Sequence, residues 1–138
     1  MYTSYFGNMR KLYINNVVPV CIARGIPKFF NGEVIHSVAP YSWMLSDKVS
    51  REEYIDAYLN QVLPNVDLDM LMETLERASH GKDVALCCYE KPEDFCHRHL
   101  LARWLHEKIG IEVKEFGVQG EPWDSKNPKV EQKSLFDM

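Results

Sequence analysis

A short apolar run at residues 84–89, Val-Ala-Leu-Cys-Cys-Tyr, constrains the fold most strongly. A nearly continuous apolar run between helical segments is typical of a parallel strand covered on both faces. The run breaks at Glu90-Lys91-Pro92, and the segment that follows has the pattern of a helix with Cys96 in its first turns. Ligands of open α/β sheets bind beyond the carboxyl ends of the strands, where the start of a helix offers N–H groups to an anion. We therefore expect a site after Tyr89.

Other segments supply the remaining elements of an α/β domain. Strands are expected at residues 1–6, 17–23 and 111–116, with Pro19 interrupting the second strand or placing it at an edge. Helices are expected from a capping box at Ser50 and Glu53 to about residue 63, from an Asp67 cap to Gly81, and up to Gly110. Strand, helix and strand with short joints indicate a parallel crossover. The predicted fold is a single α/β domain, residues 1–117, with a small, mainly parallel sheet flanked by helices in a Rossmann-like three-layer arrangement.

The bulk properties narrow the class of protein. A net charge of −4 over 138 residues argues against a large basic surface for tight, nonspecific binding of duplex nucleic acid, although a local basic groove would not show in the total charge. Neither a signal peptide nor an apolar run long enough to span a bilayer is present. We expect a cytoplasmic protein without a membrane partner, whose four cysteines are reduced thiols.

Cys96 is the candidate nucleophile. A helix N-terminus and cationic neighbours stabilise a thiolate, and His97 or His99 is available as a base. The alternative is that Cys96 is a small buried side chain that packs the first turn.

Two arginines and a glutamate are expected around the same crevice. Arg98 or His97 would meet an anionic group, Glu90 would orient one of them, and Arg24 would face the crevice from the end of the second strand. The alternative is a buried ion pair of Glu90 with Arg98 or Arg24 that only fixes the loop.

Further residues are candidates for lining the crevice. Thr3 and Ser4 end the first strand with hydroxyl groups, and Tyr41 and Trp43 lie in a long irregular segment, residues 26–48. The two aromatic rings form either a stacking surface for a planar ligand or a plug at the end of the core.

The sequence favours no metal site and indicates no cofactor. Cys88, Cys96, His97 and His99 are possible ligands, but the chain has no Cys-x-x-Cys pair, and Cys87 and Cys88 must point to opposite sides of their strand. Phosphate-binding glycine loops, dinucleotide fingerprints and nucleophile elbows are also missing.

Two motifs resemble a known family. Cys88-Tyr89-Glu90 and Cys96-His97-Arg98, with Tyr2-Thr3-Ser4-Tyr5-Phe6 and residues 22–27 near the start, are similar to the family called domain of unknown function 488. The resemblance covers roughly residues 1–117. It implies the α/β fold and the place of the site, and it implies no particular activity.

Residues 118–138 are polar and contain prolines, which predicts an extended or disordered tail. Gln132, Leu135 and Phe136 near its end resemble the peptide with which bacterial DNA-maintenance proteins dock onto the sliding clamp. Lys133 departs from that pattern, and the Leu-Phe pair could instead cover an apolar patch of the chain's own domain.

Two functions follow from these observations. One is an enzyme that acts on a nucleotide, nucleic acid or other phosphorylated ligand at the Glu/Cys-His-Arg crevice. The other is a non-catalytic binding module or adaptor in DNA maintenance, recruited through its tail.

Overall fold

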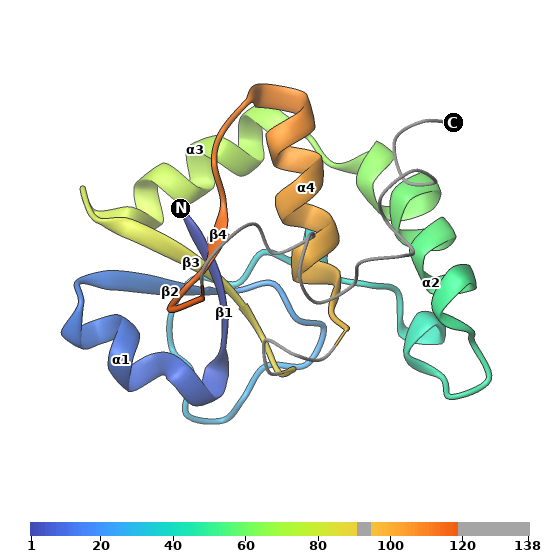
Figure 1. Ribbon diagram of the computed structural model, residues 1–138, viewed down its shortest axis with the longest axis horizontal. Helices are drawn as coiled ribbons and strands as arrows, with labels where there is room; N and C mark the ends of the chain where they lie inside the picture. The colour runs from blue at the N-terminus through green and yellow to red at the C-terminus, as the bar shows by residue number, and fades with distance from the viewer. Residues whose placement is uncertain (91–94, 119–138) are drawn as a thin grey trace.

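A computed structural model describes residues 1–90 and 95–118 of the chain (Figure 1). Its centre is a four-stranded sheet in which all paired strands are parallel, in the order β2-β3-β1-β4. The strands are β1 (Tyr2–Tyr5), β2 (Val17–Cys21), β3 (Asp83–Cys88) and β4 (Lys114–Glu115). The predicted α/β class with a mainly parallel sheet is therefore confirmed.

Helices cover both faces of this sheet. Figure 1 shows α1 (Met9–Ile14) on one side and α3 (Leu68–Ser79) with α4 (His97–Ile109) on the other. Helix α2 (Arg51–Ala57) continues into a π-helical turn at Tyr58–Val62. Together they pack against the start of α4. The result is a three-layer, Rossmann-like arrangement.

The alternation of side chains along β3 divides the core in two. Val84 and Leu86 pack in the cluster that contains the apolar residues of α3 and α4. Ala85 and Cys87 pack in the cluster around Leu12 of α1. Because side chains of a strand alternate between faces, Cys87 faces α1. Cys88, the last residue of β3, also borders this second cluster, together with Cys96 at the start of α4.

The predicted helix caps are present. The Ser50 hydroxyl accepts a hydrogen bond from the Glu53 amide, and the Glu53 carboxylate accepts one from the Ser50 amide, both at 3.0 Å. The Asp67 carboxylate accepts from the Met70 amide at 3.0 Å and begins α3. These caps fix where α2 and α3 start because they satisfy amides that have no partner within the helix.

Two elements differ from the expectation. Residues 6–14, for which no helix was predicted, form a short 3₁₀ turn followed by α1, which covers one face of the sheet. The last strand has only two residues, because β4 pairs with β1 only at Lys114 and Glu115. Pro19 lies in β2, which is at an edge of the sheet, one of the two alternatives that the sequence offered for this strand. In the described residues, no helix is long and apolar enough to cross a membrane.

Candidate active site

The predicted site lies where β3 ends and α4 begins. Cys88 is the last residue of β3 and is paired in register with Tyr5, the last residue of β1. Cys96 is the N-cap of α4, and its sulfur accepts a hydrogen bond from the Arg98 amide at 3.4 Å. A cysteine thus takes the place that Ser, Thr or Asp usually fills at the start of a helix.

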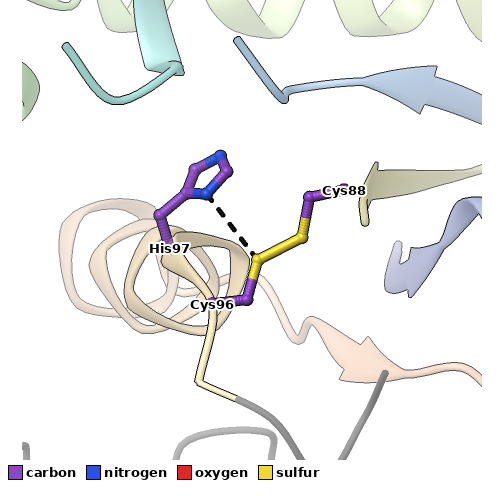
Figure 2. A group of neighbouring side chains, drawn as sticks. All are labelled: Cys88, Cys96 and His97. Atoms are coloured by element: carbon purple, nitrogen blue, oxygen red, sulfur yellow. Dashed lines mark hydrogen bonds between the residues drawn. A yellow bond between two sulfur atoms is a disulfide. The ribbon is translucent and has the colours of Figure 1, made fainter. Parts of the chain in front are cut away.

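The two cysteines form a disulfide (Figure 2). The prediction of four reduced thiols was therefore wrong for this pair. That prediction was based on the expected cytoplasmic location and on the absence of the cysteine spacing typical of disulfide-rich proteins. Neither shows that the connection after β3 brings Cys88 and Cys96 together. Cys21 and Cys87 are free and buried, as expected. Burial raises the pKa of both thiols, that of Cys87 to about 12.

His97 lies beside the disulfide with its two ring nitrogens in different roles. Nε2 is 2.7 Å from the carbonyl oxygen of Ile22, which can only accept, so the proton of the neutral ring is on Nε2. Nδ1 then carries a lone pair, and it lies 3.6 Å from the sulfur of Cys96 (Figure 2). Burial lowers the pKa of His97 to about 4, and the charge of Arg98 acts in the same direction. The ring is therefore neutral at physiological pH.

Arg98 is fully buried and points into the protein. Nε and Nη2 donate to the two carboxylate oxygens of Glu115 at 3.0 and 3.1 Å. Nη1 donates to the Cys88 sulfur at 2.9 Å and to the Glu90 carbonyl oxygen at 2.7 Å. Four of the five N–H groups of a guanidinium are thus engaged, so an anionic ligand would compete with Glu115 for Arg98.

Glu115 is the residue that the sequence interpretation missed. Besides Arg98, its carboxylate accepts from the Thr3 hydroxyl at 2.6 Å and lies 3.1 Å from Nε2 of His99. Burial alone would raise the pKa of Glu115, but the hydrogen bonds from His99 and Arg98, the charge of Arg98 and the Thr3 hydroxyl together lower it. The sequence did contain one indication that Glu115 is buried. It lies two residues after the apolar Val113 in a segment expected to be a strand, and alternate residues of a strand face the same side, which here is buried.

Glu90 contributes through its backbone rather than its carboxylate. Its carbonyl oxygen accepts from Arg98, while its side chain is exposed and its charge adds to burial in raising the pKa of Tyr54. The carboxylate that pairs with Arg98 is that of Glu115. Arg24 is exposed, two residues beyond the Ile22 carbonyl that holds His97.

The other predicted lining residues are not part of this hydrogen-bonded network. The Ser4 hydroxyl accepts from Asn8, on the opposite face of β1 from Thr3. The Tyr41 hydroxyl donates to the carbonyl of Gln61, and its ring packs against the core. Trp43 is half exposed. Gln132, Leu135 and Phe136 lie outside the described residues, so the docking peptide stays a prediction.

The arrangement offers three groups for chemistry. The sulfurs of Cys88 and Cys96 and Nδ1 of His97 all lie within 4.8 Å of one another, and all three residues are buried. A pair of thiols beside a neutral imidazole supports nucleophilic or redox chemistry of sulfur, and these are also atoms that bind metal ions.

Comparison with known proteins gives one match. The family model described as "Active DUF488-N3 subclade" matches residues 21–109, which is more than half of the chain and includes Cys88, Cys96, His97 and Arg98. No curated protein and no solved structure matches the chain.

Proposed function

This chain belongs to the DUF488 family, and we propose that it is a cysteine-dependent enzyme that acts on a phosphorylated or otherwise anionic ligand, with Cys96 as the nucleophile and His97 as its base. The matching subclade is described as active, which supports retained chemistry over a purely structural role.

One observation carries the proposal: Nδ1 of His97 faces the sulfur of Cys96 while Nε2 is held by the Ile22 carbonyl. That carbonyl fixes both the tautomer and the orientation of the ring, so the lone pair stays directed at the sulfur. A nucleophile, a base and a third group that orients the base are the parts that nucleophilic catalysis requires.

The chemistry needs the reduced form, because a sulfur bonded to Cys88 cannot attack. In the dithiol, Cys96 would pass its proton to Nδ1 of His97 as its sulfur bonds to the electrophilic atom of the ligand. The bond between that atom and its leaving group would break, and the imidazolium would return the proton to the leaving group. The imidazolium that forms is destabilised by burial, so the transfer of the proton to His97 would be coupled to the attack.

The ligand is expected to be anionic because of where this thiol lies. Cys96 caps a helix of thirteen residues at the carboxyl edge of a parallel sheet, and the partial positive charge of the helix end favours an anion there. Arg24, exposed just beyond the end of β2, would be a cation that meets this anion.

The test uses reduced protein and a panel of nucleotides, sugar phosphates and inorganic phosphate. A ligand of the proposed class should raise the melting temperature and slow the alkylation of Cys96 by iodoacetamide, followed by mass spectrometry. Arg24→Ala should weaken both effects. Arg77→Ala is the matched control, because Arg77 is an exposed arginine on α3 that pairs with Glu73.

Two results would contradict the proposal. The first is an alkylation rate of Cys96 that is the same in His97→Gln and in the wild type, since His97 then has no part in the reactivity of the sulfur. The second is that no member of the panel protects Cys96 or shifts the melting temperature.

A further inference from the structure

We propose that, once the disulfide is reduced, Cys88, Cys96 and His97 bind one zinc ion. The three side chains come from the end of β3 and the start of α4, and their ligand atoms already lie within 4.8 Å of one another. The sequence argued against a metal site because it contains no Cys-x-x-Cys pair, but the fold itself brings these ligands together.

The chemistry of the donor atoms selects the ion. Two thiolates and an imidazole suit a borderline-soft cation such as zinc, whereas magnesium and calcium prefer oxygen ligands. Three protein ligands with a fourth position for water is a common arrangement around zinc.

The spacing of the cysteines also suits a bridging ion. Their Cα atoms are 7.6 Å apart, wider than the roughly 4.4–6.8 Å between most disulfide-bonded pairs. Zinc–sulfur bonds of about 2.3 Å in a tetrahedral arrangement place two sulfurs about 3.8 Å apart. Once the S–S bond is broken, small rotations of the two side chains reach that spacing.

The surroundings of the three ligands are those that a metal site requires. A histidine that binds zinc through one nitrogen usually donates the other N–H to a carbonyl or carboxylate, and Nε2 of His97 lies 2.7 Å from the Ile22 carbonyl. The guanidinium of Arg98 donates to the Cys88 sulfur at 2.9 Å, and its amide donates to the Cys96 sulfur at 3.4 Å. Hydrogen bonds from these N–H groups stabilise the negative charge of thiolates.

The exchange between the two forms is balanced in protons and electrons. Reduction by a phosphine adds two electrons and two protons to the disulfide, and the phosphine is oxidised to its oxide with an oxygen atom from water. Zinc binding then releases the two thiol protons, because the ligands are thiolates. Zinc would occupy the sulfur and the nitrogen that nucleophilic attack uses, so zinc binding and the proposed reaction exclude each other on one molecule, although the evidence for the zinc site does not rest on the proposed function.

The test compares the full chain in its oxidised and reduced forms. Both are incubated with zinc and desalted, and bound zinc is measured by mass spectrometry. We expect one zinc per chain in the reduced form and none in the oxidised form. Zinc should also protect Cys88 and Cys96 from alkylation, and cobalt in place of zinc should give the absorption bands of a tetrahedral thiolate site.

Variants then identify the ligands. Cys96→Ser and His97→Gln should each weaken zinc binding at least about 100-fold, since even the loss of an outer hydrogen-bond partner costs roughly 10–100-fold. Cys87→Ala is the matched control: it removes a neighbouring buried thiol that faces α1, and it should keep full affinity.

The comparison of the oxidised and reduced forms uses wild-type protein only, so its result does not depend on whether any variant folds. Equal zinc content in the two forms would overturn the proposal, as would a reduced protein without zinc. Loss of binding in Cys87→Ala as large as in Cys96→Ser would also overturn it. None of these measurements depends on a substrate, so the zinc site and the enzymatic proposal succeed or fail separately.

Discussion

Neutralising the buried carboxylate of Glu115 should lower the free energy of unfolding strongly. Glu115→Gln removes the negative charge that faces the fully buried Arg98 and replaces one acceptor oxygen with an N–H₂ group. Breaking a buried ion pair from one side costs about 3–5 kcal/mol, because the remaining charge is left without compensation. Arg98 keeps its bonds to Cys88 and Glu90, so we expect the lower end, about 3 kcal/mol. For a domain of this size that is a fall of roughly 10 °C in melting temperature.

The assay is urea denaturation of the disulfide-bonded protein with a chelator present. Glu112→Gln is the control, because Glu112 is an exposed glutamate on the same segment, paired with Lys114 at 2.9 Å, and its loss should leave the midpoint nearly unchanged. The pKa of Glu115 is lowered by folding, so its stabilisation is present above the ordinary carboxyl pKa and lost as pH falls through the lowered value. Wild type and Glu115→Gln should therefore differ at neutral pH and converge in acid.

A double substitution tests whether the pair itself is responsible. Arg98→Met combined with Glu115→Gln removes both charges, so its cost should be smaller than the sum of the two single costs by about 1–3 kcal/mol. Additive costs, or a Glu115→Gln variant no less stable than Glu112→Gln, would refute the reasoning.

Three further predictions are independent of that network. Ser50→Ala removes the side-chain acceptor of the α2 cap and should lower the free energy of unfolding by about 1 kcal/mol in urea. Cys87 is buried, and burial raises its pKa to about 12. In the reduced native protein at neutral pH it should react with iodoacetamide more slowly than Cys96, whose sulfur lies 3.6 Å from Nδ1 of His97; equal rates would contradict this prediction. A peptide of residues 118–138 should bind a bacterial sliding clamp in calorimetry, and substitution of Leu135 and Phe136 by alanine should abolish binding. Equal binding of both peptides would disprove the docking motif.

Local sequence patterns predicted the central strand and the starts of α2 and α3. The apolar run of β3 and the caps at Ser50 and Asp67 depend on neighbours within a few residues, so the sequence shows them directly. The short helix α1 was missed because it buries only Leu12, which is too little for a helical pattern. Helices of this length owe their stability to packing rather than to their own sequence.

The position of the candidate residues in the fold was predicted, but the contacts between them were not predictable. Cys96, His97 and Arg98 do lie at the start of a helix beyond the central strands. Glu90, which is close in sequence, was expected to orient Arg98 or His97, or else to pair with Arg98 or Arg24. The carboxylate that pairs with Arg98 is instead that of Glu115, which also binds Thr3 from 112 residues away. Such a contact depends on strand order, which a single sequence does not contain.

The strand order has a consequence for how the protein is made. β1 leaves the ribosome before both of its neighbours in the sheet, since Tyr2 pairs with Ala85 and with Lys114. Its backbone groups and the Thr3 hydroxyl must therefore stay hydrated or bound to a chaperone until the last strand has been synthesised. Contacts between segments so distant in sequence slow folding, so the sheet forms late and as a unit.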